Sequence, residues 1–237
     1  MAQSYFIWKN VDSRSLGVKL SGPLPIIRPE ERVVHVQIPG RSGDLTELEG
    51  ENIFNSYIQT ASILVHGAYN VRNIYNWLKG SGFVTFSGEP DRKQAARIIG
   101  AITLTKHSYN LDWYEGEVQF YCQPLKQLLT EAPVVITSSG STVMNGGDVI
   151  SRPAITAKAS ATSMTVTIGG KSITISGLTI NNEYVIDSDI MEVSNTARTA
   201  LYTANSLGDF PMLNPGSNIV TGSGWSKLTI DRRERFL

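Results

Sequence analysis

Three acidic residues close together in the sequence are the strongest candidates for catalytic chemistry. Asp187, Asp189 and Glu192 lie in the run VIDSDIMEV. Two carboxyl groups facing each other across a sugar cleft can hydrolyse a glycosidic bond when one has a raised pKa and the other is ionised. The run therefore allows a cell-wall hydrolase as one hypothesis. Asp187 and Asp189 would also suit calcium, although no complete loop of oxygen ligands is visible.

Other catalytic and metal-binding patterns are absent from the sequence. His35, His66 and His107 lie in separate segments without ligand spacing, and no H-E-x-x-H, G-x-S-x-G or P-loop motif is present. The one cysteine, Cys122, lies in the apolar run VQFYCQP, which favours a core residue over a nucleophile. One cysteine also excludes an intrachain disulfide and a cysteine-rich zinc site. We therefore expect a protein that is not an enzyme and uses no cofactor and no metal.

The charge pattern gives no sign of a nucleic-acid or membrane partner. The chain has 21 basic and 21 acidic side chains, and nucleic-acid binding needs clustered Lys and Arg that release counterions. The densest basic group, Arg232, Arg233 and Arg235, is interrupted by Glu234 and is typical of a solvated strand end. We expect no sequence-specific contact with nucleic acid. No signal peptide and no apolar run of about 20 residues is present, so we expect no membrane span and synthesis in a reducing cytoplasm.

Short alternating runs bounded by turn residues predict β-strands in the first half of the chain. One segment has helical spacing instead. Val71, Ile74 and Leu78 form an apolar stripe, with Asn70 as the expected N-cap and Gly80 at the left-handed position after the helix. The expected strands are 16–20, 32–38, 57–66 and 83–86, followed by a long hairpin of 95–105 with 113–121.

The second half predicts a β-sandwich of the jelly-roll kind. Its composition shifts to Ser, Thr and Gly after Pro124 to Pro133, which places the domain boundary between residues 1–130 and 131–237. Gly169 and Gly170 form a two-residue hairpin turn. Regular spacing of short strands suits a sandwich. The seven expected strands are 134–137, 154–159, 164–168, 172–175, 184–187, 191–193 and 226–230.

Three stretches in series resemble a known family. They are 29–45, which contains IPGRSGDL; 77–91, WLKGSGFVTFSGEPD; and 186–189, IDSD, together with 208–218, GDFPMLNPGSN. In order and spacing they resemble the distal tail protein (Dit) family of long-tailed, non-contractile phages and related prophages. The resemblance extends over nearly the whole chain. The IPGRSGDL loop and the GDFPMLNPGSN run are its most specific parts.

The resemblance implies a mainly β protein of two domains. The first is a ring-forming β-sandwich or split-barrel-like domain with one helix at about 70–80, and the second is a galectin-like β-sandwich. It implies a homo-oligomeric ring of six copies in the baseplate hub at the virion tail tip. The ring joins the tail tube protein to a tail-tip protein, with a receptor-binding protein as a further neighbour. Many relatives carry an inserted carbohydrate-binding module, for which this chain is too short.

Two loops are the candidate sites. Strand edges of the first domain can supply main-chain donors and acceptors to a neighbouring copy by β-augmentation, and the loop 39–45 is interpreted as an assembly loop. Within 39–45, the candidate assembly residues are Arg41, Ser42, Gly43 and Asp44, and an ordinary surface turn is the alternative. In the third motif, prolines and glycines fix the loop geometry, and Asp209 and Asn218 cap it through backbone hydrogen bonds. The loop-structuring residues are Gly208, Asp209, Phe210, Pro211, Pro215, Gly216 and Asn218.

A carbohydrate-binding module that aids adhesion to the host cell wall is the alternative function. Large aromatic side chains can stack on sugars, and four of them, Trp225, Tyr184, Tyr202 and Phe210, are scattered through the second half. Core packing is the favoured interpretation of these rings, because aromatic side chains dominate sandwich cores.

Overall fold

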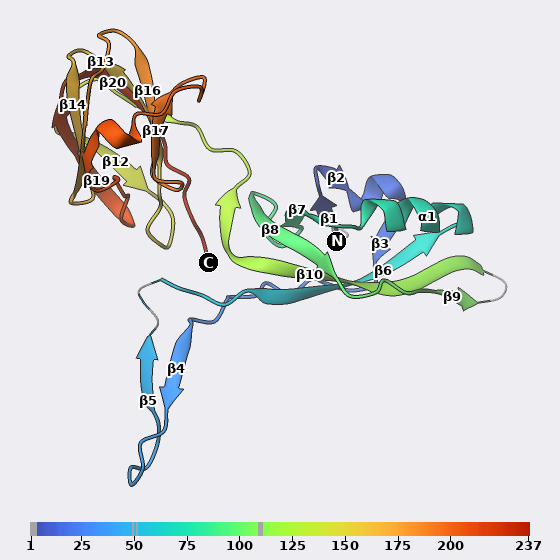
Figure 1. Cartoon of the computed structure of the whole chain (residues 1–237). Helices are drawn as coiled ribbons and strands as arrows, with labels where there is room; N and C mark the ends of the chain where they lie inside the picture. Colours follow the sequence, from blue (N-terminus) through green and yellow to red (C-terminus); the bar gives the residue numbers. More distant parts are fainter. Residues whose placement is uncertain (1–3, 49, 51, 109–110) are drawn as a thin grey trace. The chain divides into compact units, whose positions relative to one another are not determined.

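The chain divides into two compact units. The computed structural model describes residues 4–48, 50, 52–108 and 111–237, without the side chains of residues 69, 107, 108 and 111 (Figure 1). The first unit comprises residues 1–129 with Leu237, and the second comprises residues 130–236. Within the described residues, no helix has the length and apolar character needed to cross a membrane.

The first unit is one curled sheet with a helix on its core side, and a separate hairpin. The sheet order is β2-β1-β7-β8-β10-β6-β3, with β9 pairing β10 off this path, and among the described strands β4 pairs only with β5 (Figure 1). A 3₁₀ turn covers Ser13–Leu16, and α1 covers Ala68–Trp77. The strands are β1 (Phe6–Trp8), β2 (Val11–Asp12), β3 (Val18–Leu20), β4 (Val33–Val36), β5 (Leu45–Leu48), β6 (Tyr57–His66), β7 (Ser81–Phe86), β8 (Arg92–Ile99), β9 (Leu104–Ser108) and β10 (Leu111–Leu128).

Aromatic side chains join α1 to the sheet. Phe120 of β10 lies edge-on to Phe6, Trp8 and Phe86, with ring centroids 5.2, 5.6 and 5.6 Å away. The indole nitrogens of Trp8 and Trp77 each donate to the other residue's carbonyl oxygen, at 3.1 and 3.2 Å. Buried indole N–H groups need such acceptors. The end of the helix is therefore fixed to the first strand.

The helix was predicted correctly, but its N-cap was not. Ile74 and Leu78 are buried and Val71 is half-buried, so the apolar stripe faces the core. The helix begins one turn earlier than expected, with Gly67 as N-cap. Asn70 lies inside the first turn, where its side-chain amide donates to the His66 carbonyl at 2.8 Å. Tertiary packing of the stripe, and not a side-chain cap, sets where this helix starts.

The predicted long strand 95–105 is wrong, because the chain leaves the sheet in its middle. β8 ends at Ile99 and β9 begins at Leu104, while β10 pairs with both. A β-carbon on Gly116 of β10 would lie 2.1 Å from the Thr103 carbonyl oxygen. The missing side chain at Gly116 therefore admits the segment that bulges between the two strands.

The second unit consists of two five-stranded sheets. The strand orders are β11-β20-β13-β16-β17 and β12-β19-β14-β15-β18, and all pairs are antiparallel. A 3₁₀ turn covers Thr203–Asn205. The strands are β11 (Val134–Ile136), β12 (Ser141–Asn145), β13 (Ala154–Ala159), β14 (Ser163–Ile168), β15 (Lys171–Ser176), β16 (Glu183–Asp187), β17 (Glu192–Asn195), β18 (Ser206–Gly208), β19 (Gly216–Ser223) and β20 (Trp225–Asp231).

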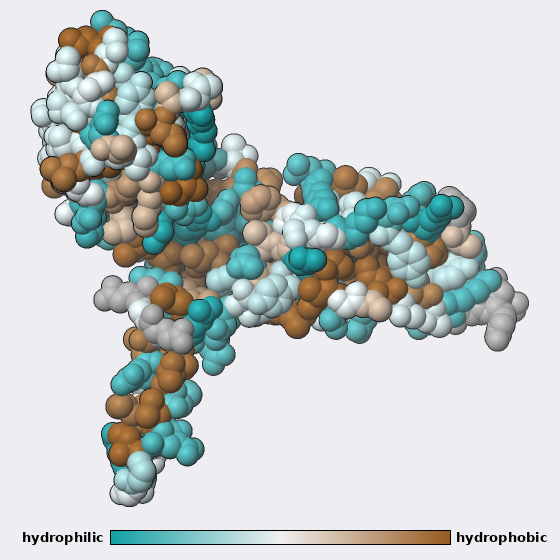
Figure 2. Space-filling view, in the orientation of Figure 1, coloured by the Kyte–Doolittle hydropathy of each residue, from teal (hydrophilic) through white to brown (hydrophobic). Residues whose placement is uncertain are grey.

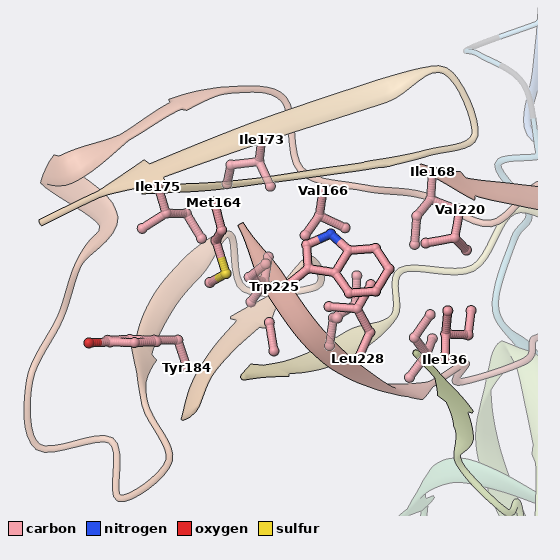
Figure 3. Packing of buried hydrophobic residues seen from close by; sticks show 14 of the residues in the cluster. Ile136, Met164, Val166, Ile168, Ile173, Ile175, Tyr184, Val220, Trp225 and Leu228 are labelled. Atoms are coloured by element: carbon pink, nitrogen blue, oxygen red, sulfur yellow. The ribbon is translucent and has the colours of Figure 1, made fainter. Parts of the chain in front are cut away.

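One apolar core fills the space between these sheets (Figure 3). The predicted hairpin is present. Ile168 pairs with Lys171 across Gly169 and Gly170, which have φ of +60° and +76°, values that suit glycine. Alternate residues of each strand, such as Ile173 and Ile175, point inward and are fully buried. The mainly β fold class is thus confirmed, with α1 as the one α-helix of the described residues.

Several strands that follow turn-rich runs were not predicted from the sequence. β19 begins at Gly216, inside the segment interpreted as a loop, and continues to Ser223. β12 and β18 were also missed in this unit, and β1, β2 and β5 in the first. These strands are short or contain glycine and serine, so their apolar periodicity is weak.

Candidate assembly surfaces

The predicted assembly loop lies at the tip of the β4–β5 hairpin. Arg41, Ser42, Gly43 and Asp44 are all exposed. The turn is held by a hydrogen bond from the Arg41 amide to the Ile38 carbonyl, 3.2 Å long. Its participation in assembly stays a prediction, since the geometry shows only that the loop is accessible.

One face of this hairpin is apolar and uncovered, and we call it the hairpin face. Val34 pairs with Glu47, and Val36 pairs with Leu45, so the four side chains lie on the same face. Val34, Val36 and Leu45 are 41%, 40% and 36% exposed. Figure 2 shows apolar surface along this hairpin. A lone two-stranded hairpin is marginally stable in water, so such a face indicates a partner.

A second uncovered feature is the edge of β6. β3 covers only residues 63–65 of β6, and the Ser21 amide extends this pairing to the Ser62 carbonyl at 3.0 Å. In a strand, the backbone N–H and C=O groups of every second residue point to the same edge. Those of Ile58 and Thr60 therefore point to the same edge of β6 as the Ser62 carbonyl. No described strand or loop hydrogen-bonds to them there. This part of β6 is a free edge that another strand could join.

A third feature lies on the sheet face opposite α1, and we call it the sheet patch. Tyr121 of β10 pairs with Ile58 on one side and Arg97 on the other, so the three lie in one row. Phe83 belongs to the adjacent row, opposite Ala95. Ile58, Phe83 and Tyr121 are 50%, 45% and 41% exposed. This face therefore carries three exposed apolar side chains, with the positively charged side chain of Arg97 next to Tyr121.

The Lys93 ammonium borders the sheet patch. Its nitrogen lies 5.4 Å from the centroid of the Phe83 ring, within the range of a cation–π contact. Two cationic side chains, Arg97 and Lys93, therefore lie among or beside the apolar side chains of the patch.

The first part of the GDFPMLNPGSN run connects β18 to the core. Gly208 ends β18, where a β-carbon would lie 2.2 Å from the Ser172 carbonyl oxygen. The Asp209 amide donates to that same carbonyl at 2.9 Å, and the Asp209 carboxylate accepts from Lys171. Phe210 packs against the core as a half-buried ring, and Pro211 is buried.

The second part of the run is organised by Asn218. Its side-chain oxygen accepts from the Asn214 amide at 2.9 Å, and its side-chain nitrogen donates to the Asn214 and Gly216 carbonyls. Asn218 is buried, and Pro215 is exposed. These contacts fix the entry of β19 and present no reactive group.

The acidic run that suggested a hydrolase is engaged in ion pairs. The Asp187 side chain is 5% exposed, and its oxygens lie 2.7 Å from Arg233 and 3.0 Å from Arg198. Burial alone would raise the pKa of Asp187, but the hydrogen bonds and charge of Arg233, with those of Arg198, hold that pKa below its ordinary value. A carboxyl so arranged is a poor proton donor.

The neighbours of Asp187 add no catalytic or metal-binding group. Asp189 pairs at 3.8 Å with Arg235, and Glu192 is exposed. Within the described part of the chain, no three potential metal-ligating side chains are grouped. The geometry thus gives no support to the glycosidase or calcium hypotheses.

The aromatic residues proposed for sugar stacking are used in the second unit's core. Trp225 is 9% and Tyr184 2% exposed, while Tyr202 and Phe210 pack partly buried against the same core. The interpretation of these rings as core residues is confirmed, and a stacking platform built on Trp225 is ruled out in this conformation.

The remaining candidates have structural partners. Cys122 is buried, which raises its pKa to about 12 and makes it inert as a nucleophile. His35 contacts Thr46 at 3.2 Å, and His66 lies edge-on to Trp113. The side chain of His107 lies outside the described atoms. Sequence reasoning missed the sheet patch, because its members come from four strands whose register no local pattern reveals.

Comparison with known proteins supports the fold. No family model matches the sequence, and no curated protein matches it. Among solved structures, the chain has the fold of SPP1 Dit (gp 19.1), described as a paradigm of the hub adsorption apparatus in phages infecting Gram-positive hosts. The TM-score is 0.80 over 100% of both chains, with 17% sequence identity. The Dit-like fold implied by the sequence resemblance is therefore confirmed.

Proposed function

We propose that the protein is a structural component of a phage or prophage tail tip. In this proposal it forms a ring of six copies that joins the tail tube to the tail-tip and receptor-binding proteins. The observation that carries the proposal is a full-length fold match to a phage hub protein, in a chain whose first unit leaves strand edges and apolar faces uncovered.

The uncovered surfaces support self-assembly. An open sheet has a free edge at β6, and a second strand pairing there would satisfy the outward backbone groups. When such a contact joins two different surfaces of one chain, the copies form a ring if the rotation closes. Ring formation would therefore satisfy the backbone groups that the β6 edge leaves free in a single chain.

The second unit would have a different part in this assembly. Its two sheets bury their apolar faces against each other, so its core is formed within one chain. We propose that the second unit is a galectin-like module carried by the ring. Its hydroxyl-rich strands and buried aromatic residues favour a structural over a catalytic role.

Native mass spectrometry with negative-stain microscopy tests the proposal. We expect a species six times the 25.9 kDa chain mass, and rings with a central channel, either alone or after addition of the cognate tube protein. A chain that stays monomeric at every concentration, with and without tube and tip proteins, would contradict it.

A variant of the free edge sharpens this test. Thr60→Pro removes the outward N–H of β6 without removing an internal ladder bond, because proline is tolerated on strand edges. We expect the monomer fold to be retained and the ring population to fall by about tenfold for one lost edge interaction. Thr60→Val at the same position is the matched control and should assemble normally.

A further inference from the structure

The hairpin face and the sheet patch are complementary in composition. The first has three exposed apolar side chains around Glu47, and the second has three around Arg97. Glu47 and Arg97 are both exposed, and neither forms an ion pair among the described residues. The hairpin face therefore carries a negative charge and the sheet patch a positive one.

The two surfaces do not cover each other within one chain. Val34 of the hairpin face is 41% exposed and Ile58 of the sheet patch is 50% exposed, so neither surface is covered by the other surface of the same chain. Exposed apolar groups gathered on a face, and not scattered singly, mark a site of association. A second copy of the chain carries both surfaces and is the occupant that satisfies both.

We propose that the hairpin face of one copy docks on the sheet patch of the next, with Glu47 opposite Arg97. This inference rests on the proposed function, because the next copy is the neighbour in the ring. Val34, Val36 and Leu45 lie against Ile58, Phe83 and Tyr121. The contact is heterologous, since it joins two different surfaces, and it repeats around a closed ring.

The contact works together with the free β6 edge. A stable interface buries about 800 Å² on each partner, which is more than three or four side chains provide. Ile58 contributes its side chain to the sheet patch and its backbone to the free edge. Edge pairing and hairpin docking therefore meet at the same strand. The hairpin supplies register and specificity through its charge.

Charge reversal tests the pairing of Glu47 with Arg97. Glu47→Arg and Arg97→Glu each place like charges in contact, and each should lower the population of assembled chains by roughly tenfold or more at fixed concentration. The double variant Glu47→Arg/Arg97→Glu restores the opposite charges and should restore assembly. Both positions are exposed, so the thermal stability of the monomer should not change, and this is measured alongside.

Cysteine cross-linking tests which surfaces meet. The native Cys122 is fully buried, so introduced cysteines report alone. Leu45→Cys chains mixed with Ile58→Cys chains should give a disulfide-linked dimer under mild oxidation. Leu207→Cys, 80% exposed in the second unit, replaces Ile58→Cys as control and should give none.

The outcomes separate this inference from the proposed function. Rings that form unchanged in both single charge reversals, without the Leu45–Ile58 cross-link, overturn the docking and leave the ring intact. A cross-linked dimer with charge rescue but no ring supports the docking and overturns the ring. A monomeric species cross-linked within a Leu45→Cys/Ile58→Cys chain shows that the hairpin folds onto its own patch, which overturns the docking between copies.

Discussion

The two units use their apolar residues in different ways. In the second, two sheets face each other and cover one core between them. In the first, a single curled sheet covers its core with one helix and leaves apolar groups on the opposite face and on a lone hairpin. The second unit also exposes apolar side chains, such as Leu207 and Ile219, but its two sheets cover each other, whereas the sheet of the first unit has one face covered by a single helix and the other face open. In the first unit, exposed apolar side chains lie together on the hairpin face and on the sheet patch, and apolar groups gathered in this way favour association.

The strongest test of this comparison asks whether the units unfold independently. Phe120 is fully buried and contacts three aromatic rings of the first unit. Phe120→Ala should destabilise that unit by about 3–5 kcal/mol. Ile186→Ala, fully buried in the second unit, is the matched control and should affect only that unit by about 2–5 kcal/mol.

Calorimetry with tryptophan fluorescence separates the two transitions. Trp225 is the one tryptophan of the second unit, so a Trp225→Phe background makes fluorescence report the first unit alone. A single transition that both variants shift equally would show that the chain behaves as one cooperative body.

The second prediction concerns the ion pairs that stabilise the second unit. Asp187→Asn leaves Arg198 and Arg233 without their carboxylate and should cost about 2 kcal/mol at neutral pH. Because the folded pKa of Asp187 is depressed, its contribution is present above its unfolded pKa of 3.8 and is lost as the pH falls through the folded value. Urea unfolding should therefore show the variant and the native chain converging below about pH 4.

Asp189→Asn is the control for this effect. Asp189 lies 3.8 Å from Arg235 and is 45% exposed, so its loss should change the unfolding free energy by less than about 0.5 kcal/mol. Equal losses from both substitutions would show that burial of Asp187 is irrelevant.

The third prediction is that the unfolding free energy of the first unit falls at alkaline pH. Burial raises the pKa of Cys122 from 9.0 to about 12, so the folded state retains a proton that the unfolded chain loses. This stability is fully present below pH 9 and is lost as the pH rises toward 12. The loss is about 1.4 kcal/mol for each pH unit above 9, and Tyr57, with its pKa raised to about 12, adds to it above pH 10.

Denaturant midpoints at pH 8 and pH 10 measure the alkaline effect. Cys122→Ala removes the thiol and should flatten the slope in the first unit's transition, although the cavity lowers its overall stability. A native first unit with no change between these pH values would refute the assignment. The second unit contains no cysteine and serves as the internal reference.

Regular alternation is what made parts of the fold predictable from sequence. Strands 57–66 and 154–159 have their expected limits, because alternate residues are buried along their whole length. β5 was missed because both of its faces are exposed, so no burial pattern marks it. β10 runs to Leu128, beyond the expected end at Tyr121, because a register shift between Cys122 and Lys126 accommodates Pro124.

The candidate sites were predictable only where they lie within one segment. The loop with Arg41 and Asp44 is continuous in sequence, and its glycines and proline mark it. The sheet patch needs the register of β6, β7, β8 and β10, which long-range pairing decides. Asp187 appeared in the sequence as one of three clustered acids without a counter-ion, because its arginine partners are 11 and 46 residues away.

The smallest predicted effect compares the hairpin turns of the two units. Gly170 and Gly43 both have left-handed φ, +76° and +82°, and a β-carbon at either would meet no atom within 4 Å. Alanine at either should therefore cost the same local strain, about 1 kcal/mol.

Gly170 connects β14 and β15, which are part of the second unit's core, so Gly170→Ala should lower that unit's unfolding free energy by the full amount. The β4–β5 hairpin pairs with no other described strand, so Gly43→Ala should open locally and leave the first unit's global stability unchanged. Denaturant unfolding gives both values, and a loss in the first unit equal to that in the second would show that the hairpin belongs to its cooperative core.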